Sequence, residues 1–238
     1  METSSYLQIN LSDWQQVGEG GNGKTYVNPE APGEILKVNK ERLNTLEAVK
    51  REYDTSKAVA NLGVSVPQIY KIVRVGDAYA TLSQLIKGKK SLSRICHDEP
   101  ERTEEMARLL CQKGKELFAT PCNTVFFPNR KEQALRAIEK TTFVSKKNKK
   151  TIRAFIETIP ESTNCVHGDF QTGNIIQAGE DYYWIDLDRF AYGDPMFDIL
   201  AGKFAAVDVV LRTVLQTPTF VEKLFFGIYV RKLVKNYF

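Results

Sequence analysis

The first third of the chain alternates between short apolar runs and polar turns rich in Gly, Pro and Asn. Runs of this length, bounded by residues that favour turns, are typical of β-strands. They fall at residues 14–17, 24–27, 35–38, 69–75 and 78–86. One longer segment, residues 41–62, has apolar side chains mostly at steps of three and four, which predicts a helix that ends at Gly63.

After residue 90 the pattern becomes helical. A helix is expected from Pro100, with an apolar face that contains Met106, Leu109, Leu110 and Leu117. Further helices are expected at residues 131–144, 151–159, 195–215 and 218–238, and the basic cluster at 146–150 is interpreted as a solvated loop. Strands first and helices later predict an α+β fold with two lobes. Residues 1–85 would form an antiparallel sheet with one helix, and residues 86–238 a mainly helical lobe.

The segment from residue 167 to residue 188 carries the strongest chemical signal. It opens with His-Gly-Asp-Phe-Gln-Thr-Gly-Asn at 167–174, in which an Asn follows an Asp five positions later. Two apolar runs, 174–177 and 182–185, flank a polar turn and predict a β-hairpin. Such a hairpin would bring Asn174 near Asp186, although twelve positions separate them.

This layout suits phosphoryl transfer, which needs an aimed nucleophile and a neutralised phosphate charge. Asp169 can accept a hydroxyl proton, and Asn174 and Asp186 can offer oxygen atoms to a metal, with Asp188 as a further contact. Like charges about 4 Å apart repel by about 4 kcal/mol at an effective dielectric constant near 20, so the acids require a divalent cation. Hard oxygen ligands indicate Mg²⁺. The alternative is plain turn chemistry, for which Asp and Asn are common.

Residues 18–25, Gly-Glu-Gly-Gly-Asn-Gly-Lys-Thr, match two phosphate-binding patterns. One is the P-loop, G-x4-G-K-[ST]; the other is G-x-G-x-x-G, through Gly18, Gly20 and Gly23. In both, glycine lets backbone amides approach a phosphate. A P-loop leads into a helix, but two prolines and another apolar run follow here. We therefore expect a glycine-rich hairpin between strands, with a plain flexible hairpin as the other alternative.

Lys37 lies in the middle of a predicted strand, fourteen residues after Gly23. This is the position of a lysine that holds the α- and β-phosphates of a nucleotide, provided that a carboxylate fixes its ammonium group. The following helix offers Glu47 and Glu52. Glu52 is favoured because it lies beside the apolar face of the helix, Glu47 is its competitor, and a solvated Lys37 is the alternative.

Composition narrows the class of protein. With 238 residues, 42% hydrophobic residues and a net charge of +4, the chain is ordinary for a globular protein and too weakly basic to indicate a nucleic-acid partner. Its four cysteines show no Cys-x-x-Cys pair, and two histidines do not complete a zinc site. No signal peptide or apolar run of membrane-spanning length is recognisable. We expect a cytoplasmic protein without a membrane partner; the oligomeric state is not predicted.

With these residues in place, the chain resembles the aminoglycoside phosphotransferase and choline kinase group within the protein-kinase-like fold. The resemblance runs from the glycine loop to about residue 200 and is carried by residues 167–174 and by Ile-Asp-Leu-Asp at 185–188. It implies that ATP is the phosphate donor, that Asp169 is the catalytic base, and that Asn174 and Asp186 bind magnesium.

Two further assignments come from the resemblance alone. The sequence Gly-Asp-Pro-Met-Phe-Asp at 193–198 resembles the Gly-Asp-Pro-x-x-Asp of the group, whose last acid, here Asp198, braces the catalytic loop. The hinge that offers backbone groups to adenine would lie near Gln84, Leu85 and Ile86.

Several features favour a small-molecule hydroxyl acceptor, such as an aminoglycoside, choline or another amino alcohol, or a sugar. Gly168 replaces the arginine of protein kinases, Gln171 replaces their usual loop lysine, and only six positions separate Asp188 from Asp194. The last forty residues carry more bases than acids, which disfavours an aminoglycoside, although acids at 99–116 remain candidate contacts. The alternatives are a protein Ser/Thr kinase and a nucleotide-binding regulator without turnover.

Overall fold

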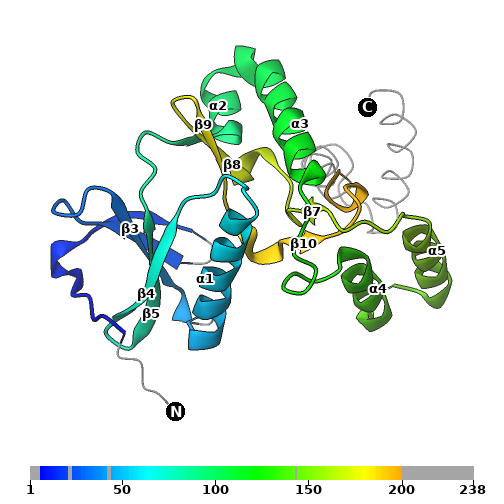
Figure 1. The fold of residues 1–238 in the computed structure, drawn as a ribbon, viewed down its shortest axis with the longest axis horizontal. Helices are drawn as coiled ribbons and strands as arrows, with labels where there is room; N and C mark the ends of the chain where they lie inside the picture. Colours follow the sequence, from blue (N-terminus) through cyan, green and yellow to red (C-terminus); the bar gives the residue numbers. More distant parts are fainter. Residues whose placement is uncertain (1–5, 21–22, 42–43, 143, 200–238) are drawn as a thin grey trace. The chain divides into compact units, whose positions relative to one another are not determined.

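Five antiparallel strands build the sheet in the N-terminal part of the chain. The structure is a computed structural model that describes residues 6–20, 23–41, 44–142 and 144–199. The strands are β1 (Gln15–Glu19), β2 (Gly23–Val27), β3 (Glu34–Asn39), β4 (Ile69–Val75) and β5 (Ala78–Gln84). They lie in the order β1-β2-β3-β5-β4. Figure 1 labels β3, β4 and β5 of this sheet. The predicted strands are therefore confirmed, each to within two residues at either end.

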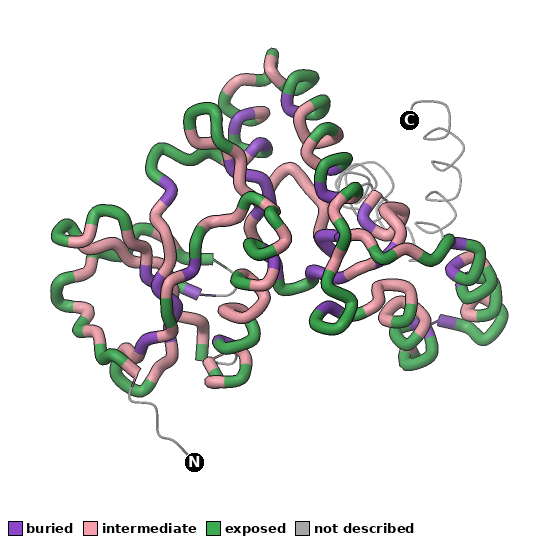
Figure 2. Tube along the Cα trace, viewed as in Figure 1, coloured by how far each residue is buried: buried purple, intermediate pink, exposed green. Residues whose placement is uncertain are grey.

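The register of the sheet separates an apolar face from a polar one. Leu36 pairs with Leu82, and Val73 pairs with Ala80, so these side chains share a face, where they are at most 2% exposed. Figure 2 shows the buried positions gathered in the middle of these strands. Because side chains alternate along a strand, Lys37 lies on the opposite face from Leu36.

Helix α1 (Leu46–Asn61) packs against β4 and β5. It begins five residues later than predicted, because Thr45 adopts an extended conformation and its side-chain oxygen accepts the Ala48 N–H at 3.1 Å. Val49 and Val59 are its buried residues. The helix ends just before Gly63, as the sequence indicated, because a residue with a φ of 80° is in the left-handed region and does not extend a right-handed helix.

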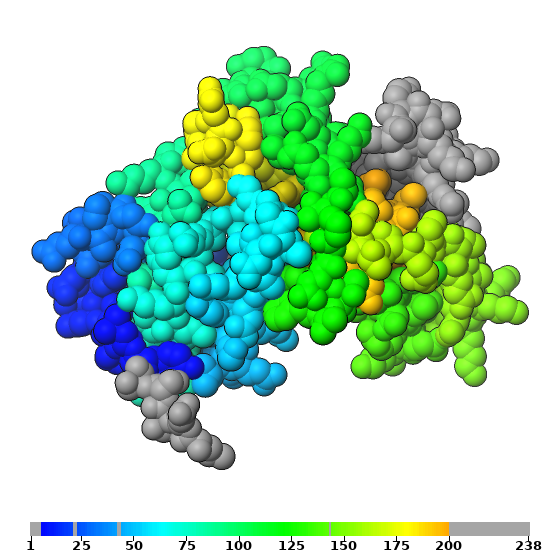
Figure 3. Space-filling model, viewed as in Figure 1, coloured from blue at the N-terminus to red at the C-terminus, as the bar shows by residue number. Residues whose placement is uncertain are grey.

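The chain divides into two compact units. The first runs to Glu101 and also contains Ile175–Asp188; the second holds Arg102–Asn174 and the described residues 189–199. This division differs from the predicted break after residue 85, because the β8–β9 hairpin joins the first unit. β8 (Ile175–Ala178) pairs with both β6 (Lys90–Ser91) and β9 (Asp181–Trp184). Figure 3 shows the hairpin against the segment that carries α2 (Leu92–Asp98), on which β8 packs.

The second unit is mainly helical. Its elements are α3 (Thr103–Ala119), α4 (Arg130–Lys140), α5 (Lys146–Glu157), the strands β7 (Cys165–Val166) and β10 (Ala191–Tyr192), and the short 3-10 helix η4 (Thr172–Asn174). Met106 and Leu117 are buried on α3, as the pattern predicted. Ile138 of α4 packs with Ile152 and Ile156 of α5 in a common core.

In the second unit, the start of α5, the end of α4 and one loop were also predicted wrongly. α5 begins at Lys146 rather than at 151, so the basic cluster is helical and not a loop. Its start is fixed by Ser145, whose hydroxyl accepts the Asn148 N–H at 3.3 Å, despite the unfavourable placement of positive charge at a helix N-terminus. α4 ends at Lys140 rather than at 144, because Thr141 is extended.

The C-terminal predictions fall largely outside the described residues. The helix expected at 195–215 is described only up to residue 199, and the one expected at 218–238 not at all. None of the helices in the described part of the chain combines the length and the apolar composition that a bilayer crossing requires.

Candidate active site

The glycine-rich segment joins β1 to β2 in a hairpin of the first unit. Gly18 pairs with Thr25 of β2, and the Gly20 N–H donates to the Gly23 carbonyl oxygen at 2.9 Å. A Cβ at Gly23 would collide with the Val38 carbonyl oxygen of β3, whereas a Cβ at Gly20 would meet nothing within 4 Å. Since a strand follows the glycines, the P-loop alternative is wrong. Gly23 is required by packing within the sheet, and Gly20 has open space beside it.

Lys37 forms an ion pair with Glu52 across the space between β3 and α1. Lys37 Nζ lies 2.8 Å from Glu52 Oε1, and Glu52 Oε2 accepts a hydrogen bond from Asn39 Nδ2 at 3.3 Å. The side chains of Lys37 and Glu52 are 34% and 29% exposed, so the ammonium group remains accessible to a ligand. Glu47, in the first turn of α1, is exposed. The structure thus confirms Glu52, and not Glu47, as the partner of Lys37.

The predicted hinge lies at the end of β5. The Gln84 N–H donates to the Gln68 carbonyl oxygen at 2.7 Å, and the Leu85 N–H donates to the Gly33 carbonyl oxygen at 2.9 Å. Ile86 is buried at 7% exposure. The amides of Gln84 and Leu85 are thus both already used within the first unit, and backbone contacts of Gln84 and Ile86 to a nucleotide base stay a prediction.

The two acids after the β8–β9 hairpin also lie in the first unit. Ile175 pairs with Trp184 at the open end of the hairpin. Asn174 comes directly before Ile175 along the chain, and Asp186 comes two residues after Trp184. Asp186 has a φ of 63°, and no other described residue except glycine has a positive φ. Such strain costs about 1–3 kcal/mol and is concentrated at functional sites. Asp186 and Asp188 are both exposed.

The loop around Asp169 belongs to the second unit. Asn174 Nδ2 donates to both the carbonyl oxygen (2.8 Å) and Oδ2 (3.0 Å) of Asp169, and Gln171 Nε2 donates to the same Oδ2 at 3.0 Å. Two donors fix one oxygen of the carboxylate and leave Oδ1 outside these bonds. The Phe170 ring packs on Phe118 of α3, with 5.3 Å between ring centroids, and anchors the loop.

Asp198 braces the start of this loop, as predicted. It is 0% exposed and accepts the His167 N–H at 2.5 Å and the Gly168 N–H at 2.7 Å. Burial raises the pKa of Asp198 to about 6, and the two backbone hydrogen bonds and the charge of Arg130 oppose this shift. Gly168 has a φ of 82°, and a Cβ there would collide with the Arg189 carbonyl oxygen. Glycine at this position is therefore a packing requirement of the loop.

Arg130 is a residue of the site that the sequence did not indicate. It is the first residue of α4, and its Nη2 donates to the Gly168 carbonyl oxygen at 3.1 Å. The two residues are 38 positions apart, and α4 shows only the local signal of a helix start, the Asn129 side chain that accepts the Glu132 N–H. Nothing in that signal points to the catalytic loop.

The chemistry of the donors fits a hard divalent cation. Both hydrogen bonds of Asn174 to Asp169 use its amide nitrogen rather than its amide oxygen, and Asp186 and Asp188 of the first unit carry carboxylate groups. Among the described residues, no group of three or more His, Cys, Asp or Glu side chains is placed to hold a metal ion. Metal binding by this mixed amide and carboxylate set therefore stays a prediction.

Comparison with solved structures confirms the predicted protein-kinase-like α+β fold. One neighbour is a thermostable mutant of aminoglycoside phosphotransferase APH(4)-Ia in ternary complex with ADP and hygromycin B, with a TM-score of 0.58, 15% identity and coverage of 80% of this chain and 71% of that one. A choline/ethanolamine kinase family protein from Mesorhizobium loti has a TM-score of 0.52, 15% identity and coverages of 90% and 73%. Amicoumacin kinase hAmiN, in complex with AMP-PNP, Ca²⁺ and Ami, has a TM-score of 0.56, 13% identity and coverages of 93% and 72%.

Sequence comparison assigns the family. No curated protein matches the chain. A family model described as the phosphotransferase enzyme family matches residues 13–207, which is most of the 238 residues and includes both the glycine hairpin and the loop around Asp169. The chain therefore belongs to the phosphotransferase enzyme family.

Proposed function

We propose that this protein is an ATP- and Mg²⁺-dependent phosphotransferase that moves the γ-phosphate to a hydroxyl group of a small molecule. The observation that carries the proposal is the fixed carboxylate of Asp169, which Asn174 and Gln171 hold through Oδ2 while Oδ1 lies outside these bonds. A carboxylate held in this way can orient a hydroxyl group and accept its proton. Family membership and the ADP and AMP-PNP named for two neighbours support a nucleotide as the phosphate donor.

Each remaining site residue has a role in this proposal. Lys37, oriented by Glu52, holds the α- and β-phosphates, and the glycine hairpin approaches the triphosphate with its backbone amides. Gln84 and Ile86 contact the base. When bound, magnesium would neutralise the charge that develops on the transferred group; its proposed ligands are Asn174, Asp186 and Asp188.

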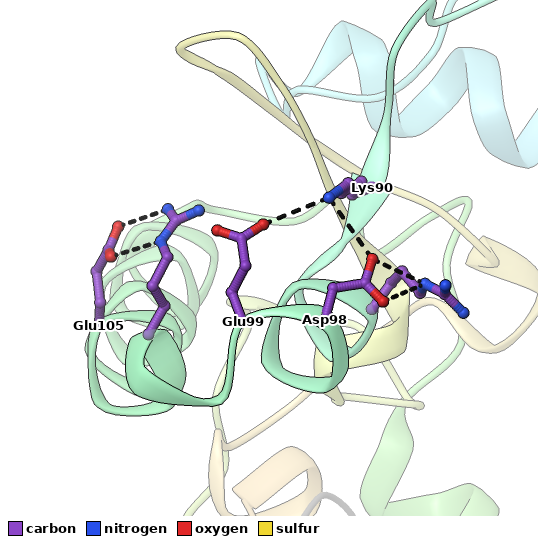
Figure 4. A network of polar contacts seen from close by, with 6 residues as sticks. Lys90, Asp98, Glu99 and Glu105 are labelled. Carbon is purple, nitrogen blue, oxygen red and sulfur yellow. Dashed lines mark hydrogen bonds and ion pairs between the residues drawn. The ribbon is translucent and has the colours of Figure 1, made fainter.

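Four of the five acids at 99–116 form ion pairs with nearby cations, as does the neighbouring Asp98. In the first unit, Lys90 lies 3.5 Å from Asp98 and 3.3 Å from Glu99 (Figure 4). In the second unit, Arg102 bonds Glu105 at 2.9 Å, and Arg108 and Lys113 pair with Glu104 and Glu116. Paired charges exert a weaker field on a ligand than free carboxylates do. This pairing favours an acceptor with few positive charges, such as an amino alcohol or a sugar, over an aminoglycoside.

We place the reaction in the cytoplasm. The four cysteines are free thiols, which fits a reducing compartment.

Replacing Asp169 by Asn tests the assignment of the catalytic base. The amide keeps the size of the side chain but cannot accept the hydroxyl proton, so kcat should fall by about 10²–10⁴-fold while the Kd for Mg-AMP-PNP changes little. Asp181→Asn, an exposed acid at the start of β9, is the matched control and should retain wild-type kcat. Unchanged turnover of Asp169→Asn on the true acceptor would remove Asp169 from the proposed role.

A screen of acceptors identifies the substrate class. The protein is incubated with Mg-ATP, and in parallel with Mg-GTP, over aminoglycosides, amino alcohols, sugars and nucleosides, and ADP or GDP release is measured. Phosphorylated small molecules would support the proposal. In a parallel incubation with a cell extract and ATP that carries a labelled γ-phosphate, label found only in proteins would favour a protein kinase. Nucleotide binding without transfer to any acceptor would favour a regulator without turnover.

A further inference from the structure

We propose that Arg130 is a positioning residue that orients Asp169 for phosphoryl transfer by holding the carbonyl group of Gly168. The inference rests on the function proposed above and adds to its machinery a residue from α4. All of the contacts that carry it lie within the second unit.

The guanidinium group of Arg130 is fixed at both of its terminal nitrogens. Nη2 donates to the Gly168 carbonyl oxygen at 3.1 Å, and Nη1 donates to Gln133 Oε1, one turn further along α4, at 3.2 Å. Gly193 packs closely against the helix start, because a Cβ added there would lie 3.1 Å from the Arg130 Cβ. Because these groups leave the side chain little freedom, the donor to Gly168 is preorganised.

The peptide groups on either side of Gly168 are thereby tethered in two directions. Asp198 accepts the N–H of Gly168 at 2.7 Å, and Arg130 donates to its carbonyl oxygen at 3.1 Å. The next residue along the chain is Asp169. These two bonds restrict rotation of the peptide group that leads into Asp169, and they act together with the bonds from Asn174 and Gln171 to Oδ2 in setting the direction of its side chain. Small displacements of a reacting group lower turnover strongly.

Arg130 is also a cation that faces the buried Asp198 and the half-buried Asp169. Its charged form is favoured by Asp198 and Asp169, while burial and the nearby Arg189 lower the pKa of Arg130. The pKa of Asp198, about 6, is a balance: burial and the charge of Asp169 raise it, and the amides of His167 and Gly168 and the charge of Arg130 lower it. Without Arg130, the pKa of Asp198 would rise above about 6. A larger fraction of Asp198 would then be protonated near neutral pH, and its hold on the loop would weaken.

Two substitutions and a control test the role through turnover. Arg130→Met removes both the hydrogen-bond donor and the positive charge, whereas Arg130→Lys keeps the charge but lacks the two terminal nitrogens of the guanidinium group. Arg136→Met is the control, because Arg136 is an exposed arginine of the same helix that pairs with Glu132. For Arg130→Met, kcat should fall about 10- to 100-fold with the KM for ATP within about twofold. The acid limb of its kcat–pH profile should move to higher pH by about one unit, whereas Arg130→Lys should keep the wild-type limb. Arg136→Met should match wild type in all three measurements.

Hydrogen exchange of the peptide that covers residues 167–174 provides a readout without any acceptor. Exchange should be about tenfold faster in Arg130→Met and unchanged in Arg136→Met. Faster exchange in Arg130→Met together with a wild-type protein that transfers no phosphate would show that Arg130 holds the loop, and would refute the proposed function. Wild-type values of kcat, acid limb and exchange in Arg130→Met would refute the positioning role. If Arg130→Met does not fold, a fall in kcat for Arg130→Lys at a wild-type melting temperature supports the role, and wild-type kcat for that variant overturns it.

Discussion

Asp198→Asn should separate the stability of this protein from its activity. The carboxylate is fully buried and accepts two backbone N–H groups, those of His167 at 2.5 Å and Gly168 at 2.7 Å. Asparagine has nearly the same shape but only one acceptor oxygen. One of the two amides would therefore face an NH₂ group and lose its bond, and the loop that carries Asp169 would be tethered at one point fewer.

The magnitude follows from the pKa of the buried group. Burial raises the pKa of Asp198 from its ordinary value of 3.8 to about 6, which corresponds to about 3 kcal/mol of stability. Because the folded pKa is above the unfolded one, this stability is present below 3.8 and is lost as pH rises through about 6. Asparagine does not titrate. The free energy of unfolding of Asp198→Asn, relative to wild type, should therefore increase by about 2 kcal/mol between pH 4 and pH 7, because at pH 4 part of the full effect is already lost.

The same substitution, Asp198→Asn, should lower the turnover of the protein near neutral pH. Loss of a charge-assisted hydrogen bond is worth about 1.5–3 kcal/mol, so kcat near neutral pH should fall by at least about tenfold in Asp198→Asn. Urea unfolding of both proteins at several pH values gives the stability difference, and initial rates give kcat; exposed Asp181→Asn is the control. A stability difference that does not change with pH would refute the raised pKa. Wild-type kcat would refute the bracing role.

Two further predictions concern the nucleotide. Gly23→Ala should destabilise the protein by about 1–3 kcal/mol and weaken Mg-AMP-PNP binding, because the added Cβ meets a backbone oxygen of β3. Gly20→Ala, whose added Cβ meets nothing within 4 Å, should bind Mg-AMP-PNP like wild type. Equal Kd values for the two variants would contradict this account. Glu52→Gln leaves the Lys37 ammonium without its counter-charge and should raise the KM for ATP about tenfold. Because the pair is about one third exposed, the melting temperature should hardly change; a large drop in melting temperature with a normal KM would show that the pair is structural.

Local patterns explain what was predictable. The strands of the sheet and the β8–β9 hairpin follow from apolar runs bounded by turn residues, and the hairpin turn at Gly179, with a φ of 63°, lies where the polar segment indicated it. The P-loop was excluded for an equally local reason, since prolines cannot continue a helix. Helix ends were less predictable because capping competes with periodicity, as Thr45 and Ser145 show.

The chemistry and the order of the site are properties of the sequence itself. The spacing from Asp169 to Asn174, the strand end before Asp186, and a lysine on the second strand after the glycines are fixed along the chain, and they suffice to indicate phosphoryl transfer. Register places Lys37 on the face opposite Leu36 without further information, because side chains alternate along a strand.

Tertiary structure alone decided which distant groups meet. Packing of α1 on the sheet selected Glu52 rather than Glu47 as the partner of Lys37, and pairing of β8 with β6 assigned the hairpin to the first unit. Burial gave Asp198 its raised pKa, and the docking of α4 brought Arg130 to the Gly168 carbonyl oxygen. These contacts join residues 15 to 87 positions apart. No periodicity encodes them, because they arise from the way in which elements pack and exclude water.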